Sequence, residues 1–153
     1  SNYYHNYAIS GEVENVPNIW PSILRLLNNV GLYDREPLTY VLQFVGIIVI
    51  PLLVAKISLT SSRRRDINTS LLLAIFVSFY PVLFYFSLDI YRDVFMVLVF
   101  LLALFFLKEL SISKRRSYKL LLYMILLLMA YFLFLLRPYL GFAFTVSLVF
   151  WGL

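Results

Sequence analysis

The sequence predicts an all-α fold, a polytopic transmembrane helix bundle of about five spans preceded by an extracytoplasmic interfacial segment. Of the 153 residues, 62% are hydrophobic and only 14% are charged, and the mean hydropathy of +0.87 lies well above that of a soluble domain. Long stretches carry no charge on any helix face, so burial of their apolar surface requires lipid. We assign residues 1–37 to the extracytoplasmic segment and 38–153 to the transmembrane domain.

The extracytoplasmic segment opens with a polar and aromatic strip, SNYYHNYA at residues 1–8. Apolar residues then recur at helical spacing behind Pro21 and stop before Gly31, which predicts an amphipathic helix over about 19–30. We expect this helix to lie on the membrane surface, with Trp20 and the tyrosines at the boundary between lipid and water. Two roles stay open: the segment anchors the chain, or it roofs a site for a lipid-linked substrate.

Apolar stretches predict the membrane spans, since a span needs about 20 residues. They cover about 38–57, 67–88, 91–110, 119–136 and 139–153. The third contains a charge-free run of only 14 residues, 94–107, so its flanking charges should lie near the edge of the hydrocarbon. Proline disfavours helix at the residue before it and begins a helix well, so Arg137-Pro138 predicts a tight hairpin, with a re-entrant segment as the alternative.

Lysine and arginine in the short loops predict the orientation of the spans. Nine of the 13 basic residues fall in two loops, namely Lys56, Arg63, Arg64 and Arg65, and then Lys108, Lys114, Arg115, Arg116 and Lys119. The opposite side carries only Arg25, Arg35, Arg92 and Arg137. We therefore expect the two basic loops in the cytoplasm and the N-terminal segment on the opposite side of the membrane.

The start of the chain lacks the pattern of a signal peptide, so we expect an upstream span to deliver the N-terminal segment across the membrane. The chain would then be an internal part of a longer protein. Membrane lipids and the remaining spans, or other membrane subunits, are its expected partners.

Composition excludes several kinds of site. Cysteine is absent and His5 is the single histidine, so neither a thiolate nucleophile nor a Cys- or His-rich metal site is possible. Phosphate-binding, dinucleotide-binding, metalloprotease and serine-hydrolase motifs are missing. The net charge of +5 marks orientation rather than a nucleic-acid partner. We expect no metal and no cofactor.

Charged residues at the predicted outer boundary are the candidates for chemistry. Asp89 precedes Arg92 and Asp93 by three and four positions, which places the three on one face of a helix. They form either a salt-bridged helix cap or a functional group. Arg137 has no acidic residue within ten positions, so it needs an anion: a lipid phosphate, an outer carboxylate or a phosphorylated substrate.

Three stretches resemble the bacterial multi-pass polymerases of oligosaccharide repeat units, the Wzy and EpsG-like group that builds O-antigen, capsule or exopolysaccharide. They are SNYYHNYA (1–8), LDIYRDV (88–94) and LLRPYLG (135–141). The resemblance implies a glycosyltransferase that moves a growing glycan from undecaprenyl diphosphate to another lipid-linked repeat unit on the outer face.

The resemblance also implies roles for the boundary residues. Arg92 or Arg137 would stabilise the departing diphosphate, and Tyr91 and Tyr139 beside them would bind substrate. The catalytic base would be Asp89 or Asp93, with His5 as a third candidate. Two alternatives remain: a non-enzymatic flippase, transporter or accessory membrane subunit, and a glycosyltransferase that uses a polyprenyl-phosphate sugar.

Overall fold

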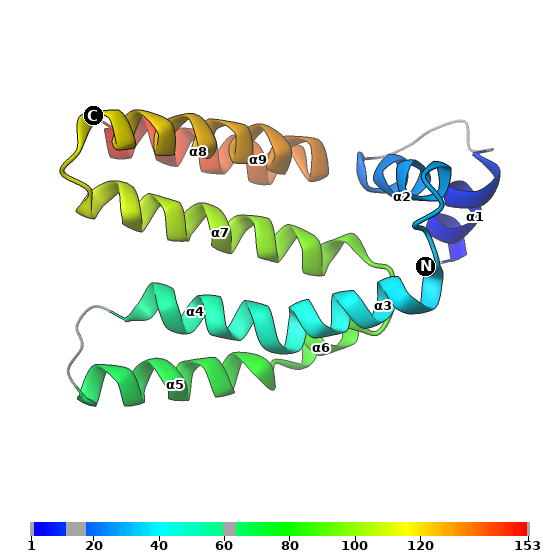
Figure 1. Ribbon diagram of the computed structural model, residues 1–153, viewed down its shortest axis with the longest axis horizontal. Coiled ribbons are helices and arrows are strands. Elements are labelled where there is room, and N and C mark those ends of the chain that lie inside the picture. The colour runs from blue at the N-terminus through cyan, green and yellow to red at the C-terminus, as the bar shows by residue number, and fades with distance from the viewer. Residues whose placement is uncertain (1, 12–17, 60–63, 153) are drawn as a thin grey trace.

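A computed structural model describes residues 2–11, 18–59 and 64–152, and all the regular structure in those ranges is helical (Figure 1). The helices are α1 (Asn2–Ser10), α2 (Trp20–Asn29), α3 (Arg35–Phe44), α4 (Ile50–Ser58), α5 (Arg64–Ser78), α6 (Pro81–Ser87), α7 (Arg92–Ile112), α8 (Arg116–Leu136) and α9 (Pro138–Gly152), with a π-helical segment, η1 (Val45–Val49), that joins α3 to α4. The predicted all-α class is confirmed.

The long helices form an antiparallel stack in which each packs on its neighbours (Figure 1). Helix α7 lies between α8 and the continuous α3–η1–α4 helix, α9 packs on α8, and α5 packs on α4. Helices α1 and α2 pack together at the end of the stack where α3 begins.

Three helices are long and apolar enough to cross a membrane: Arg35–Ser58, Arg92–Ile112 and Arg116–Leu136. A fourth is possible if the bent pair α5 and α6 makes one span. The described part of α9 is apolar but shorter. A membrane helix bundle is thus supported. Of the five predicted spans, the described helices support three, or four if the bent pair counts as one span.

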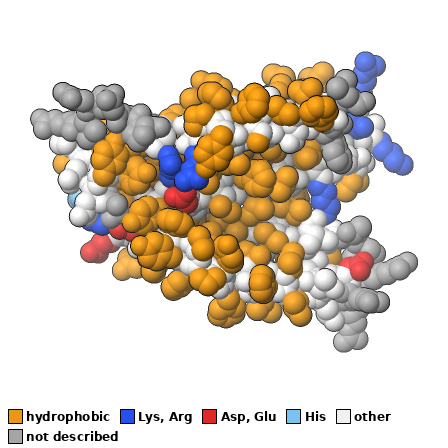
Figure 2. Space-filling model, turned by 180° about the vertical axis from the view of Figure 1, so that it is seen from behind, with side chains coloured by type: hydrophobic (Ala, Val, Ile, Leu, Met, Phe, Trp, Pro, Cys, Tyr) orange, Lys and Arg blue, Asp and Glu red, His pale blue; other side chains and the backbone are white. Residues whose placement is uncertain are grey.

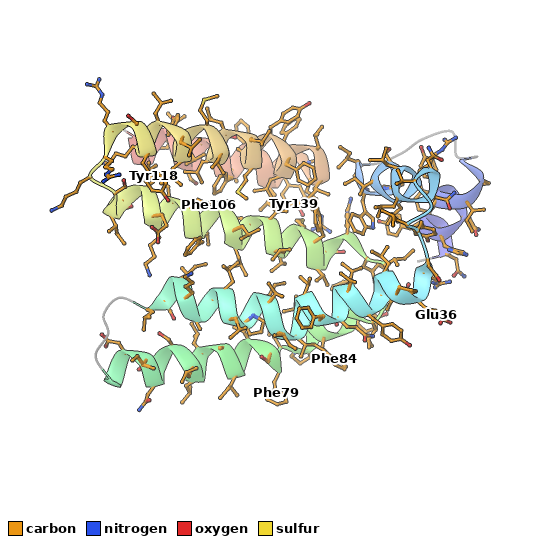
Figure 3. The ribbon with its side chains drawn as sticks, in the orientation of Figure 1. Glu36, Phe79, Phe84, Phe106, Tyr118 and Tyr139 are labelled. Carbon is orange, nitrogen blue, oxygen red and sulfur yellow. The ribbon has the colours of Figure 1, made fainter. Side chains whose placement is uncertain are left out.

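The predicted span at 67–88 is not a straight helix. Helix α5 ends at Ser78, α6 begins at Pro81, and their axes differ by 55°. Pro81 has no N–H to donate to the preceding turn, and its ring disfavours helix at Tyr80, which is extended. Figure 3 places Phe79 at this break, and its side chain is 80% exposed.

The short charge-free run at 94–107 lies inside a full-length helix. Helix α7 has 21 residues, from Arg92 to Ile112, because Lys108 and Glu109 continue it beyond the apolar run. The predicted hairpin at Arg137-Pro138 is confirmed, with α8 ending one residue before Arg137 and α9 beginning one residue after it. A Cβ added to Gly141 would lie 2.3 Å from the Phe134 backbone, so only glycine permits this close packing of α8 on α9.

Helix α2 matches the predicted amphipathic helix, and Gly31 ends it as expected. Gly31 has a φ of +74°, and the backbone N–H of Leu32 donates to the Leu27 carbonyl, as in a Schellman motif. Trp20 corrects the prediction of an interfacial aromatic, because it is only 3% exposed and packs within the protein. Leu26 and Val30, on the predicted apolar stripe, are exposed instead.

Two hydrophobic clusters hold the fold together. The first joins α1 and α2 to the helix bundle and contains Ala8, Trp20, Leu24, Leu42, Ile50, Ile90, Val94 and Leu136. The second lies among α7, α8 and α9 and contains Val99, Ala103, Leu126, Ala130, Leu133, Phe144 and Leu148. Many other large apolar side chains face outward, which suits contact with lipid rather than water (Figure 2).

Candidate functional site

The turn between α6 and α7 brings the two predicted carboxylates to the end of the stack where α1 and α2 lie. Asp89 lies in the turn, where its Oδ1 accepts a hydrogen bond from the Ile90 N–H at 2.7 Å. Tyr91 is extended, and α7 begins at Arg92. The prediction that Asp89 shares a helix face with Arg92 and Asp93 is therefore wrong, because the chain leaves helical geometry between them.

Asp89 pairs with an arginine from the start of the first predicted span. The Arg35 Nη2 donates to Asp89 Oδ2 at 3.1 Å and lies 3.4 Å from Oδ1. The other terminal nitrogen of Arg35 donates to Asn2 Oδ1 of α1 at 3.3 Å. Asp34 begins α3 by accepting a hydrogen bond from the Glu36 N–H, and this cap sets the position of Arg35.

Asp93 pairs with Arg137. The sequence predicted that Arg137 binds an anion, but left open whether it is a lipid phosphate, a carboxylate or a phosphorylated substrate. The Arg137 Nη2 donates to Asp93 Oδ1 at 3.1 Å across 44 positions of sequence. Arg137 also donates to the Tyr139 hydroxyl, and its guanidinium carbon lies 5.7 Å from the centre of the Tyr139 ring. A carboxylate is thus its partner in this structure, and both side chains are partly exposed.

The predicted helix cap with salt bridges among Asp89, Arg92 and Asp93 is wrong, because both carboxylates pair with other arginines. The Arg92 Nη1 lies 3.4 Å from the Leu136 carbonyl at the end of α8, and Arg92 makes no ion pair with any acidic side chain that the structure describes. Arg92 and Arg137 therefore lie at the same turn between α8 and α9. Figure 2 shows basic and acidic side chains in contact on an otherwise hydrophobic face.

Trp20 ties the N-terminal segment to this end of the bundle. Its indole N–H donates to the Ile90 carbonyl at 3.0 Å, and its ring packs on Phe95 with centroids 5.4 Å apart. Helix α2 is thereby fixed over the turn that carries Asp89. Whether the segment anchors the chain or roofs a substrate site stays a prediction.

His5 lies in a separate part of the site. Its Nδ1 is 3.0 Å from the Tyr33 hydroxyl. Burial raises the pKa of Tyr33 above its ordinary value of 10.0; Arg35 opposes this effect, and Asp89 and Asp34 add to it. Tyr33 is consequently a neutral hydrogen-bonding group at physiological pH.

Two hollows flank the ion pairs. An apolar cavity of about 420 Å³ lies between α4, α5, α6 and α7, where the α5–α6 bend opens the bundle. Its walls include Ile50, Phe76 and Leu83, and Asp93 is the one charged residue among its described lining. A polar pocket of about 470 Å³ lies between α3 and the end of α6, beside Arg35 and Asp89.

No protein-family model, curated protein or solved structure matches this chain.

The predicted site residues fall into two groups. Asp93, Arg92, Arg137 and Tyr139 meet where α7 faces the α8–α9 hairpin, whereas Asp89 and His5 belong to the network around Arg35 and Tyr33. Tyr91 packs edge-on against the Phe86 ring, 5.5 Å between centroids. Within the described ranges there is no group of three or more metal-ligating side chains.

Sequence analysis missed Arg35, which it counted only as a basic residue of the outer side. Its position one residue after the Asp34 cap, at the start of a span, was the available signal. That position puts Arg35 at the same boundary as Arg92 and Arg137.

Proposed function

We propose that the chain is part of a membrane glycan polymerase that transfers a lipid-diphosphate-linked oligosaccharide onto another lipid-linked repeat unit, at the outer face of a bacterial inner membrane. The observation that carries the proposal is the grouping of Arg92 with the Arg137–Asp93 ion pair beside an apolar cavity that Asp93 borders. Guanidinium groups suit a diphosphate, and an apolar cavity suits the polyprenyl chain attached to it.

The proposed reaction is a substitution at the anomeric carbon of the donor sugar. The acceptor hydroxyl oxygen forms a bond to that carbon, the bond from the carbon to the diphosphate oxygen breaks, and the diphosphate leaves as an anion. Arg92 and Arg137 stabilise the negative charge on the leaving group, and the Asp93 carboxylate accepts the hydroxyl proton.

Asp93 is the preferred base because its ion-pair partner also belongs to the proposed anion site. A diphosphate bound at Arg137 competes with Asp93 for the guanidinium and releases the carboxylate to accept a proton. Asp89 instead pairs with Arg35, and His5 is hydrogen bonded to Tyr33. Neither residue is among the described lining of the apolar cavity.

The proposed orientation follows from the two ends of the bundle. The junctions α4–α5 and α7–α8, which contain the basic loops, lie at one end, and the α6–α7 and α8–α9 turns lie at the other (Figure 1). Arg63 belongs to the first basic loop but lies outside the described residues.

Single-cysteine labelling tests the orientation, since the chain has no natural cysteine. Asn29→Cys and Ser117→Cys place a thiol at an exposed position of each end. A membrane-impermeant maleimide added to intact spheroplasts should label only the Asn29→Cys protein. Labelling of the Ser117→Cys protein instead would put the arginines in the wrong compartment and remove the proposal.

Polymer length tests the mechanism. In cells that make the full-length protein, Arg92→Ala and Arg137→Ala should abolish long glycan chains while the protein remains inserted in the membrane. Arg25→Ala is the matched control, because Arg25 is an exposed arginine of α2 that faces the Tyr7 ring rather than the ion pairs. Normal polymer ladders in both site mutants would exclude this mechanism and leave the transporter or accessory-subunit alternative.

A further inference from the structure

The polar pocket at the start of the first predicted span has a lining unlike that of the apolar cavity. One face of α3 supplies Arg35, Glu36, Thr39, Tyr40 and Gln43, and the α6–α7 turn supplies Leu88 and Asp89. The α3 positions recur at helical spacing, so they line the pocket as a single stripe. Figure 3 shows Glu36 on α3, near the end of the bundle where α1 and α2 lie.

The charges of this pocket disfavour a simple ion. Two carboxylates, Glu36 and Asp89, face one guanidinium, Arg35, so a phosphate would meet a negative surplus. A metal cation would be repelled by the positive charge of the Arg35 guanidinium. A neutral ligand with many hydroxyl groups suits the set, because each hydroxyl both donates and accepts hydrogen bonds.

Tyr40 and Gln43 supply the other groups that a sugar ring needs. The Tyr40 side chain is 65% exposed and offers an aromatic face to the apolar side of a pyranose. The Gln43 amide offers both donors and an acceptor. Thr39 makes its own hydrogen bond to the Arg35 carbonyl, 2.8 Å away, and so contributes mainly shape.

Gln43 is in an environment that calls for a partner. It lies eight residues into the Arg35–Ser58 span, roughly 12 Å from Arg35 along the helix. Gln43 is partly exposed, and its amide makes no hydrogen bond to any side chain or backbone group that the structure describes. An amide at that depth is costly unless something binds it. The π-helical segment begins two residues later at Val45, and such segments are frequent at functional sites.

We propose that this pocket is a sugar-binding subsite, in which Glu36, Asp89 and Gln43 bind hydroxyls of a pyranose that lies against Tyr40. The proposal deepens the proposed function and rests on it, since the sugar would be the glycan of the lipid-linked substrate. Asp89 is four residues from Asp93, so the diphosphate at Arg137 and the glycan in this pocket would occupy adjoining sites.

The test compares one lipid with and without its sugar. The full-length protein in phosphatidylcholine nanodiscs is titrated with undecaprenyl diphosphate, and then with the same lipid carrying N-acetylglucosamine, galactose or glucose. For at least one of the three sugars the wild-type protein should bind the glycosylated lipid on the order of tenfold more tightly than the bare lipid, because about 1.4 kcal/mol of added interaction gives that ratio.

The variants separate the pocket from the diphosphate site. Gln43→Leu and Tyr40→Leu should each reduce the sugar-dependent ratio to below about twofold while the affinity for the bare lipid stays unchanged. Tyr40→Phe keeps the aromatic face and should preserve the ratio. Leucine is favourable in lipid, so both leucine variants should insert normally.

The outcomes distinguish two failures. If the wild-type ratio is near one for all three sugars, or if the leucine variants keep the wild-type ratio, the sugar subsite is excluded while the diphosphate site stands. If undecaprenyl diphosphate binds no better than phosphatidylglycerol, and Arg137→Ala leaves its affinity unchanged, the proposed function fails and takes the sugar subsite with it.

Discussion

The two ends of the helix bundle handle positive charge in different ways. At the end with α1 and α2, Arg35 and Arg137 each pair with a carboxylate from the α6–α7 region, at 3.1 Å in both cases. At the opposite end, Lys108 donates to backbone carbonyls of the α4 C-terminus, and neither of the ion pairs seen in the described residues lies there.

This difference matches the proposed roles, in which the cations of one end orient the protein in the membrane and those of the other end form the anion site. A loop lysine or arginine needs only water and lipid headgroups, and its number matters more than its partner. A guanidinium held at the hydrocarbon edge needs an anion, and an arrangement that holds it ready can exchange a carboxylate for a phosphate. The predictions below test that distinction.

The largest effect is expected from a methyl group inside the hairpin that presents Arg137. Gly141→Ala would place a Cβ 2.3 Å from the Phe134 backbone, which cannot move aside like a side chain. We expect a loss of stability of about 3 kcal/mol or more, and loss of the Arg137–Asp93 pair. Thermal unfolding in detergent measures it, with Phe142→Leu at the exposed neighbouring position as the control. An unchanged unfolding temperature would contradict the close packing of α8 on α9.

Exchange of the two charges should break the Arg137 pair and then restore it. Asp93→Arg alone, or Arg137→Asp alone, places two like charges side by side at the hydrocarbon edge. Each single exchange should destabilise the protein by about 2 kcal/mol. The double exchange should recover most of that stability, yet polymer synthesis should stay lost because the base has moved. Thermal unfolding and polymer length are measured on the same four proteins. Recovery of polymer length would exclude Asp93 as the base.

Much of the fold was predictable because lipid imposes simple rules. Apolar runs gave the membrane helices 35–58, 92–112 and 116–136 to within a few residues, and Arg137-Pro138 gave the hairpin. The bend at Pro81 was missed because the run at 67–88 was judged by its length alone. Trp20 was misplaced because an interfacial tryptophan and a buried one look alike in sequence; its hydrogen bond to the Ile90 carbonyl spans 70 positions.

The site was predictable in its residue types but not in its pairs. Asp89, Asp93 and Arg137 could be chosen because charge at a lipid boundary is costly. Their ion-pair partners could not be predicted. Asp89 and Arg35 are 54 positions apart, and only the packing of α3 beside α6 brings them together. In the sequence Gln43 is a single amide within an apolar run, and the polar pocket that it lines forms only where α3 faces the α6–α7 turn.

At the basic end, removal of one cation should affect stability but not the site. Lys108 Nζ lies 3.1, 2.9 and 2.6 Å from the carbonyl oxygens of Lys56, Ile57 and Leu59, where α4 ends. Lys108→Met removes these charge-assisted hydrogen bonds and should cost about 1–2 kcal/mol. Lys114→Met removes an exposed charge without this contact and should cost much less. Thermal unfolding compares the two, and equal effects would contradict the capping role.

The smallest expected effect concerns Tyr33, a neutral member of the site end. Its pKa is raised above 10.0, mainly by burial, so its contribution to folding is fully present below about pH 10 and is lost as the pH rises through the folded-state pKa. Tyr33→Phe removes the hydrogen bond with His5 and should cost about 1 kcal/mol or less, by an amount that stays constant from pH 7 to pH 9. Thermal unfolding measures that cost. The difference in tyrosinate absorbance between the wild type and Tyr33→Phe gives the titration of Tyr33 alone, which should occur at higher pH than that of the exposed tyrosines. Tyr85→Phe, which alters an exposed tyrosine of α6, is the control. A Tyr33 phenol that titrates together with the exposed tyrosines would show that its hydroxyl is open to water, unlike the buried Trp20 ring.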